Sequence, residues 1–354
     1  MTLKLSNLRE QLKKEEIGAL LITNPYNRSY MTQFTGTAGV AIVSADDAVF
    51  ITDFRYTEQA EKEIEGYRIV QHTTTMIEEV ATQVKNMNVK IIGFEKDDMA
   101  FGLYELYANE IEAEMKPVSG LVEKLRMVKT SDELSILQKA AKIADDAFEH
   151  IITYIKPGIT ELEVSNELEF FMRKQGATSS SFSIIVASGL RSALPHGVAT
   201  DKVIESGDFV TLDYGALYEG YISDITRTVA VGEPSEKLKE IYAVVLEAQE
   251  LALKGIKPGM TGIEADAIAR DHIASKGYGD AFGHSTGHGI GMEVHEAPGL
   301  SFRSETVLEP NMVVTVEPGI YLPAIGGVRI EDDIVITEDG NERLTFATKD
   351  LLIL

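Results

Sequence analysis

Short apolar runs alternate with helical patterns through the first third of the chain. The apolar runs have the length and composition of strands: ALLIT (19–23), VAIVS (40–44), AVFIT (48–52), YRIVQ (67–71) and VKIIGF (89–94). Apolar residues recur at helical spacing in LSNLREQLKKEEI, FRYTEQAEKEI and MIEEVATQVKNM. This alternation predicts an α/β domain with a parallel or mixed sheet. We find no catalytic constellation in this region.

A longer helical pattern follows at residues 121–155. Thr130 or Ser131 can serve as its N-cap, because a glutamate stands at the spacing of a capping box. A Pro-Gly pair follows the pattern and marks its end. We therefore predict an N-terminal α/β domain at 1–128 and a second domain at 129–354.

The same stop signal occurs twice. IKPGITELE (155–163) resembles IKPGMTGIE (256–264), which begins 101 residues later. The resemblance continues into two strand pairs that carry two acids each: Asp213 and Asp224 in the first, Glu317 and Glu331 in the second. Aligned helix ends, caps and strands favour an internal duplication over coincidence. A pseudo-twofold assembly of the two halves would bring the four carboxylates together.

Composition narrows the setting. At 354 residues, with 44% hydrophobic and 25% charged residues, the chain resembles an ordinary soluble protein of about two domains. It has no cysteine, which excludes disulfides, zinc–thiolate sites and cysteine nucleophiles. We expect a cytoplasmic protein, because no apolar run resembles a signal peptide or a membrane span. The net charge of -23 argues against nucleic acid or an anionic membrane as a partner.

Five metal-capable residues stand in segments that otherwise resemble buried strands or glycine-rich turns: Asp213, Asp224, His288, Glu317 and Glu331. An ionised side chain is costly in such a place unless a cation meets it. Four carboxylates and one imidazole suit two hard or borderline divalent cations, and four negative charges balance two doubly charged ions. The set therefore predicts a dinuclear site and hydrolysis by a metal-activated water.

Some members of this set have simpler interpretations. Asp213 and Asp224 taken alone could be exposed acids of a hairpin. Glu331 is followed by two aspartates and could belong to a solvated acidic turn. Glu317 is a stronger candidate, because it follows an apolar run and needs a partner there.

Histidines gather in the glycine-rich segment FGHSTGHGIGMEVHE. It places three of the seven histidines of the chain, His284, His288 and His295, within twelve residues. The glycines allow close backbone approach or positive φ. A surface or pH-sensing cluster is the alternative interpretation of these histidines. His196, in SALPHG, lies near the position that the duplication pairs with His295.

The ordered motifs LDYG, SDITRT, GHGIGMEVHE, VEPGIY and GVRIEDD resemble the metallopeptidases with the pita-bread fold, peptidase family M24B. Within them the chain is most similar to the Xaa-Pro peptidases, prolidase and aminopeptidase P. The resemblance covers residues 130–354 in detail. It implies a creatinase-like α/β N-terminal domain followed by an α+β pita-bread catalytic domain with an internal pseudo-twofold duplication. Methionine aminopeptidases share the catalytic fold but usually lack the N-terminal domain, so they match less well.

The resemblance also implies how the metal ions are held. One ion would be bound by Asp213, Asp224 and Glu331, and the other by Asp224, His288, Glu317 and Glu331. Glu317 would also act as general base and proton shuttle. We expect two divalent metal ions, with Mn²⁺ preferred and Co²⁺, Zn²⁺ or Fe²⁺ as alternatives.

The other site residues are expected to contact or position the substrate. His196 and His295 would donate hydrogen bonds to the substrate carbonyl or its tetrahedral intermediate. His284 would shape the subsite for proline. Arg329, on the same strand face as the ligand two residues later, would orient carboxylates. Tyr321 would have a similar role or a structural one.

The expected activity is hydrolysis of the bond between an N-terminal residue and a following proline in a short peptide. Prolidases resembling this chain usually carry an arginine shortly after the HE motif, where it can pair with the carboxylate of a dipeptide. Here Gly299 holds that position and Arg303 comes four residues later. The choice between dipeptides and longer Xaa-Pro peptides is therefore open. The resemblance implies a homodimer, and the alternatives are a creatinase-like enzyme or a non-catalytic binding protein.

Overall fold

The structure is a computed structural model that describes residues 2–354, and it consists of two compact units. The division falls between Arg126 and Met127, within the short helix α6 (Glu123–Met127). The boundary that the sequence predicts, after residue 128, lies two residues further along and stays a prediction. Among residues 2–354, no helix has the length and apolar character needed to cross a bilayer.

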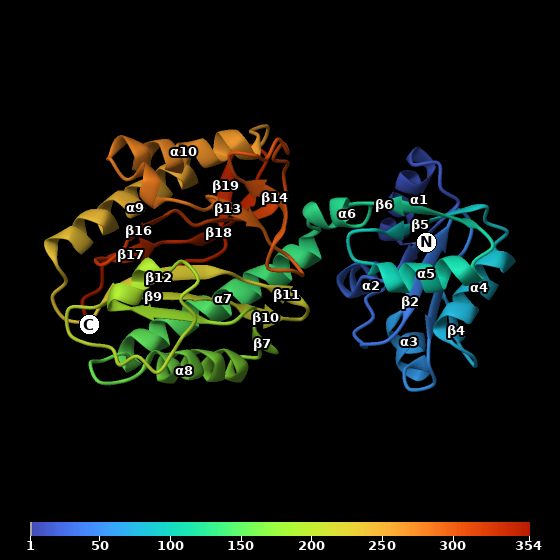
Figure 1. Cartoon of the computed structure of the whole chain (residues 1–354), viewed down its shortest axis with the longest axis horizontal. Coiled ribbons are helices and arrows are strands. Elements are labelled where there is room, and N and C mark those ends of the chain that lie inside the picture. Colours follow the sequence, from blue (N-terminus) through green and yellow to red (C-terminus); the bar gives the residue numbers. More distant parts are fainter. Residues whose placement is uncertain (1) are drawn as a thin grey trace. The chain divides into compact units, whose positions relative to one another are not determined.

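The N-terminal unit is built on a mixed six-stranded sheet with the order β4-β3-β2-β1-β5-β6 (Figure 1). Its strands are β1 (Ala19–Ile22), β2 (Val40–Ser44), β3 (Ala48–Thr52), β4 (Arg68–Gln71), β5 (Ile91–Glu95) and β6 (Glu114–Val118). Its helices are α1 (Leu3–Lys14), α2 (Pro25–Thr32), α3 (Thr57–Glu63), α4 (Met76–Asn86) and α5 (Phe101–Glu110). The strands β1, β2 and β3 pair antiparallel, whereas β1 with β5, β5 with β6 and β3 with β4 pair parallel. The predicted α/β character is confirmed.

One buried acid fixes the start of α2. Glu95, at the end of β5, accepts hydrogen bonds from the backbone N–H groups of Thr23 at 2.7 Å and Asn24 at 2.8 Å. It also accepts one from the Asn27 side chain at 2.8 Å. Burial raises the pKa of Glu95 to about 7, although these hydrogen bonds oppose the shift. The second unit contains a larger group of buried acids, described below.

The second unit contains four long helices and several small sheets. The helices are α7 (Ser131–Tyr154), α8 (Glu161–Lys174), α9 (Glu236–Gly255) and α10 (Gly262–Ser275), with the 3₁₀ turns η1 (Gly189–Ala193) and η2 (Gly279–Ala281). The strands of the first half are β7 (Ser179–Ser180), β8 (Ile185–Ser188), β9 (Phe209–Tyr214), β10 (Ala216–Tyr218), β11 (Tyr221–Ile222) and β12 (Ile225–Ala230). Those of the second half are β13 (Gly287–Gly289), β14 (Glu296–Leu300), β15 (Val313–Val316), β16 (Gly319–Leu322), β17 (Gly326–Arg329), β18 (Asp332–Ile336) and β19 (Asn341–Arg343).

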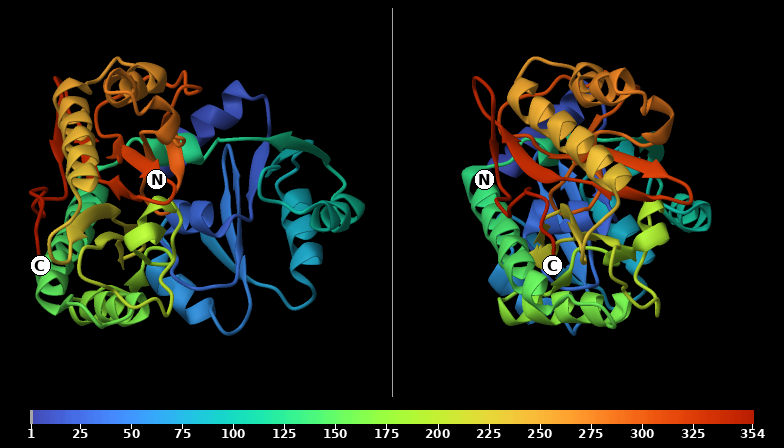
Figure 2. Two further views of the ribbon diagram at one scale, coloured as in Figure 1. Left: turned by 60° about the vertical axis from the view of Figure 1, so that its left-hand side comes forward. Right: turned by 90° about the vertical axis from the view of Figure 1, so that its left-hand side faces the viewer.

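The internal duplication is visible in how these elements pack. Figure 1 shows the strands of the unit between the helix pair α7 and α8 and the pair α9 and α10, and both views of Figure 2 show the same layering. Each helix pair packs on its own apolar core. The two main ladders have the orders β12-β9-β8 and β14-β13-β15-β18-β19. The predicted pseudo-twofold α+β architecture is therefore present.

Local sequence explains why the two halves match. Thr160 and Thr261 cap α8 and α10, and each forms a capping box with the glutamate three residues later. The preceding helices end before Pro-Gly pairs, in which Gly158 and Gly259 have φ of +96° and +86°. These values lie in the left-handed region that glycine adopts without steric cost. The repeated Pro-Gly-x-Thr signal thus encodes a repeated turn between two helices.

Candidate metal centre

The first pair of acids comes from the antiparallel ladder of β9 and β12. Asp213 lies in β9 and stands opposite Thr226 in β12. Asp224 precedes Thr226 by two residues, so it lies on the same face as Asp213, because side chains alternate along a strand. The second pair follows the same plan. The ladder of β15 and β18 ends with Val316 opposite Asp332, and Glu317 and Glu331 are the next residues beyond that pair.

The two ladders meet at β12 and β18. The backbone N–H of Glu331 donates to the carbonyl of Thr226 at 3.1 Å, and that of Asp224 donates to Oδ2 of Asp333 at 2.9 Å. The Thr226 hydroxyl also donates to Oε2 of Glu331 at 2.5 Å. These contacts bring the two acid pairs, which are distant in sequence, to the same cavity.

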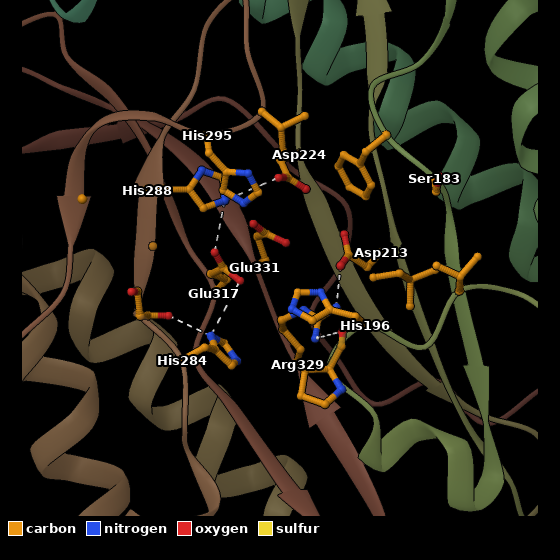
Figure 3. A pocket seen from close by; sticks show the side chains of 18 residues that line it. Ser183, His196, Asp213, Asp224, His284, His288, His295, Glu317, Arg329 and Glu331 are labelled. Carbon is orange, nitrogen blue, oxygen red and sulfur yellow. Dashed lines mark hydrogen bonds and ion pairs between the residues drawn. The ribbon is translucent and has the colours of Figure 1, made fainter. Parts of the chain in front are cut away.

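His288 completes the group from the short strand β13. Its Nδ1 lies 3.1 Å from the carbonyl of Gly289, and its Nε2 lies 3.3 Å from Oε1 of Glu317 and 3.8 Å from Oδ2 of Asp224. Donor atoms of Asp224, His288 and Glu331 all lie within 4.8 Å of one another. Figure 3 shows these side chains pointing toward one another, with Asp213 further along the same cavity.

Three of the buried acids are strongly destabilised as anions. Burial, reinforced by the neighbouring carboxylates, raises the pKa of Asp224 and of Glu331 well above its usual range. Burial also raises the pKa of Asp213, although Arg329 opposes the shift. Oδ1 of Asp224 is buried and has no hydrogen-bond partner among the described residues. Such groups need a cation to be stable as carboxylates.

Glu317 and His288 form an ion pair beside these acids. Burial alone would raise the pKa of Glu317, but the hydrogen bond and the charge of His288 lower it to about 2. Burial alone would lower the pKa of His288, but its hydrogen bond to Glu317 raises it. The contact with His288 therefore favours the carboxylate form of Glu317.

The donor set fits divalent metal ions. It offers four carboxylates and one imidazole nitrogen, which hard and borderline divalent cations prefer. The partnerless oxygen of Asp224 and the raised pKa values of Asp213, Asp224 and Glu331 are the features that a bound cation would relieve. The solvated acidic turn considered for Glu331 is wrong, because Glu331, Asp332 and Asp333 are all buried.

Arg329 connects several parts of this centre. Its guanidinium forms an ion pair with Asp213 and donates to the hydroxyl of Tyr321 at 2.7 Å and to the carbonyl of Pro195 at 3.1 Å. Its Nε donates to the Thr226 hydroxyl at 3.1 Å. Arg329 and Glu331 both line the cavity, but they do not lie on one continuous strand. The strand β17 ends at Arg329, which contacts Glu331 only through Thr226.

The predicted substrate residues lie around the same cavity of about 640 Å³. His196, His284, His295 and Arg329 line it, and Figure 3 shows His196 on the other side of the carboxylates from the three remaining histidines. His196 and His295 are exposed, and neither side chain makes a hydrogen bond among the described residues. Their imidazoles are therefore free to bind a ligand.

His284 and Tyr321 form a separate contact at this wall. His284 Nε2 lies 2.8 Å from the Tyr321 hydroxyl, and its Nδ1 lies 2.8 Å from the carbonyl of Ser285. Tyr321 is not among the lining residues, so it acts behind the wall by holding His284 and Arg329. Burial lowers the pKa of His284 and of His295.

Sequence reasoning missed some residues of the site. Asp333 is buried beside Asp224, and its Oδ1 has no partner among the described residues. The alternation of strand side chains could have identified it, because it stands two residues after Glu331. Phe182, Ile185 and Val294 supply apolar cavity wall, and no local pattern marks them.

Comparison with known proteins agrees with this architecture. Residues 135–338 match the description "Metallopeptidase family M24", and residues 4–128 match "Creatinase/Prolidase N-terminal domain". The chain belongs to metallopeptidase family M24. The M24 match covers both halves of the duplication and all five predicted ligand positions.

Relatives within the M24 family align over nearly the whole chain. The Xaa-Pro dipeptidase of Pyrococcus furiosus is 43% identical, with 99% of each chain covered. Among solved structures, the Xaa-Pro dipeptidase from Bacillus anthracis is 64% identical with a TM-score of 0.98, and the X-Pro aminopeptidase from Thermotoga maritima is 41% identical with a TM-score of 0.91. Both alignments cover 99% of each chain. These likenesses extend through both units.

Proposed function

We propose that this protein is a metal-dependent exopeptidase that hydrolyses the bond between an N-terminal residue and a following proline. The observation that carries the proposal is the convergence of Asp213, Asp224, His288, Glu317 and Glu331 on one cavity, where Oδ1 of Asp224 has no hydrogen-bond partner among the described residues. Relatives that are named Xaa-Pro dipeptidase and X-Pro aminopeptidase support the substrate class.

The five side chains would hold two divalent ions. Asp213, Asp224 and Glu331 would bind one ion, and Asp224, His288, Glu317 and Glu331 the other. Bound ions of this kind lower the pKa of water and stabilise negative charge on a peptide carbonyl. The short bond from Thr226 to Glu331, together with Arg329 behind it, would fix the orientation of the ligand carboxylate.

The chain's own groups would carry the proton and orient the peptide. Glu317 faces the cavity and would accept a proton from the attacking water and deliver it to the proline nitrogen. His196 and His295 have imidazoles without a protein partner and can donate to the substrate carbonyl as negative charge develops on it. His284, fixed by Tyr321, would border the subsite for the proline ring.

The decisive experiment combines metal analysis with peptide cleavage. Chelator-treated protein should not cleave Ala-Pro-Ala, and reconstitution with Mn²⁺ should restore cleavage together with bound metal. Ala-Ala-Ala should be a poor substrate, because the proline ring and its nitrogen without hydrogen are what the site is proposed to select. Activity indifferent to complete metal removal would overturn the proposal and favour a creatinase-like reaction. Metal binding without any cleavage would favour a binding protein.

We propose further that peptides longer than a dipeptide are accepted. Gly299 lines the cavity and has no side chain that could pair with a dipeptide carboxylate, and a Cβ built there would lie 3.9 Å from the nearest atoms, in ordinary van der Waals contact. Ala-Pro-Ala should therefore be cleaved at least as well as Ala-Pro. A strong preference for Ala-Pro would show that another group holds the dipeptide carboxylate. In Gly299→Arg, kcat/KM for Ala-Pro should rise about tenfold relative to Ala-Pro-Ala, since a guanidinium can pair with that carboxylate.

The native metal, the assembly and the location are proposed from the donor set and from the resemblance to Xaa-Pro peptidases. The oxygen-rich donor set favours Mn²⁺ as the native metal, with Co²⁺ or Zn²⁺ as alternatives, and metal analysis of protein purified without chelator tests this. The resemblance to Xaa-Pro peptidases favours a homodimer in the cytoplasm. Light scattering during size-exclusion chromatography measures the assembly, and cell fractionation measures the location.

A further inference from the structure

His196 is positioned only through its backbone. Its side chain is exposed and makes no hydrogen bond among the described residues. It lies in the loop of residues 188–200, which includes η1, and Pro195 and Val198 on either side of it also line the cavity. Whatever holds this loop therefore decides where the His196 imidazole stands.

A single buried carboxylate ties both ends of the loop. Glu161, the first residue of α8, has no exposed surface. It accepts hydrogen bonds from the backbone N–H and the hydroxyl of Ser188, both at 2.8 Å. It also accepts bonds from the backbone N–H of Thr200 at 3.1 Å and from its hydroxyl at 2.8 Å. The loop thus leaves the body of the unit and returns to it at the same anion.

Arg191 links this anchor to the cavity wall. One arm of its guanidinium forms an ion pair with Glu161, and the other donates to the carbonyl of Val198 at 2.9 Å. On the inner side of the loop, Arg329 holds the carbonyl of Pro195 at 3.1 Å. The residue before His196 and the second residue after it are therefore both fixed by arginines.

We infer that Glu161 and Arg191 are positioning residues that act through His196. The planar fork of Arg191 spans the anchor and the loop in a way that an ammonium group cannot reproduce. This inference rests on the proposed function, because it assumes that His196 contacts the substrate. The ion pair between Arg191 and Glu161 sets the rate of reaction by holding the His196 imidazole in place.

The other half of the unit uses a similar device for His295. Glu296 accepts hydrogen bonds from the backbone N–H groups of Met292 at 2.8 Å and Glu293 at 3.0 Å. Lys129 lies 3.4 Å from the same carboxylate. A carboxylate therefore fixes the backbone near each of the two exposed histidines, which supports positioning as the purpose of the contact.

Arg191→Lys tests the inference, with Arg173→Lys as the matched control. Lysine keeps the charge facing Glu161 but gives up the simultaneous contact with Val198. Arg173 lies on α8, as Glu161 does, and its exposed side chain pairs with Glu169 on the same helix rather than with the loop that carries Arg191. Thr200→Val is a milder second variant, because it removes one hydroxyl from the same carboxylate.

Hydrogen exchange measures the positioning without any activity assay. The backbone amides of Leu194 and of residues 196–198 should exchange at least about fivefold faster in Arg191→Lys than in the unsubstituted protein, and Arg173→Lys should leave them unchanged. Unchanged exchange in Arg191→Lys and in Thr200→Val would overturn the inference.

A double-mutant cycle measures whether the effect passes through His196. Arg191→Lys should lower kcat/KM for Ala-Pro-Ala about tenfold, and the same change in a His196→Ala background should lower it less than twofold. Metal content and melting temperature should match those of the Arg173→Lys control. Equal losses in both backgrounds would assign a general structural role and overturn the inference. Failure of the unsubstituted protein to cleave any Xaa-Pro peptide would instead overturn the proposed function.

Discussion

The segment of residues 331–333 carries three buried acids whose side chains face two different electrostatic environments. Asp332 points away from the cavity, toward Arg227 at 2.7 Å and Lys349 at 3.0 Å. Burial alone would raise its pKa, but these cations hold the pKa well below its usual range. Glu331 and Asp333 face the other way, and burial raises the pKa of both well above the usual range. Adjacent residues of one segment therefore differ in whether the protein itself supplies the positive charge.

This difference separates Asp332, which is paired within the protein, from the proposed metal ligands. A buried carboxylate with its own arginine and lysine stabilises the fold only while all partners remain. Buried carboxylates that face one another without enough cations destabilise the fold and are retained where something else supplies the charge. Substitutions that remove the charge and change little else test the contrast between Asp332 and Asp224.

The largest expected effect comes from Asp224→Asn. The amide keeps the shape of the side chain but removes the anion proposed to bridge both ions, so turnover of Ala-Pro-Ala should fall about a thousandfold, or roughly 4 kcal/mol in activation free energy. The metal-free variant should be at least as stable as metal-free unsubstituted protein, because one buried negative charge that neighbouring carboxylates repel disappears. Steady-state kinetics and urea unfolding measure the two quantities. A variant with normal metal content and turnover would contradict the bridging assignment.

Asp332→Asn should have the opposite profile. Removing this anion leaves Arg227 and Lys349 buried without their carboxylate, and Gln249 and Thr345 lose a charged acceptor. Loss of one partner from a buried ion pair costs about 3–5 kcal/mol. Urea unfolding of the metal-free protein measures the loss. Metal stoichiometry at saturation should stay unchanged in the fraction that folds, and a stable variant with impaired metal binding would contradict the division between the two sides.

The sequence predicted much of this centre but not its surroundings. The ligand residues stand in distinctive motifs, and the repeated Pro-Gly-x-Thr signal predicted that Asp213 and Asp224 have counterparts in Glu317 and Glu331. The different environments of Asp332 and Asp333 depend on Arg227 and Lys349, which come from distant parts of the chain. No local pattern contains that information.

The N-terminal unit shows the same limit for helices. α5, with the sequence FGLYELYANE, has apolar residues around most of its circumference, so its hydrophobic periodicity is weak. α2 is short, but its Asn24 cap followed by Pro25 is a recognisable start signal that pattern reading alone passed over. Strands were easier to predict, because their apolar runs are continuous and fully buried in the case of β1, β2 and β3.

Metal binding should stabilise the protein by a smaller amount. At a free ion concentration one hundredfold above the dissociation constant, one site adds about 2.7 kcal/mol to the free energy of unfolding. Thermal unfolding of chelator-treated protein with and without Mn²⁺ measures this gain. The gain should persist in protein carrying Arg173→Lys and be much reduced in Asp224→Asn. An equal gain in Asp224→Asn would place the stabilising ion elsewhere.

The smallest effect concerns Glu95, a buried acid that is satisfied by hydrogen bonds rather than by a metal or an arginine. Burial raises its pKa to about 7 from its ordinary value of 4.5, so between these values the folded state binds more protons than the unfolded state. Its contribution to stability is therefore fully present below pH 4.5 and is lost as the pH rises toward 7, by about 2 kcal/mol between pH 5 and pH 7. In Glu95→Gln this dependence should vanish, although the variant loses the bond from Asn27. Urea unfolding at several pH values measures the free energy of unfolding of the variant and of the unsubstituted protein. The difference between the two isolates the contribution of Glu95 from those of all other titrating groups. A difference that stays constant over this range would mean that the hydrogen bonds from Thr23 and Asn24 keep Glu95 ionised. Backbone N–H groups would then stabilise a buried anion in the first unit, whereas the buried anions of the second unit would need metal ions.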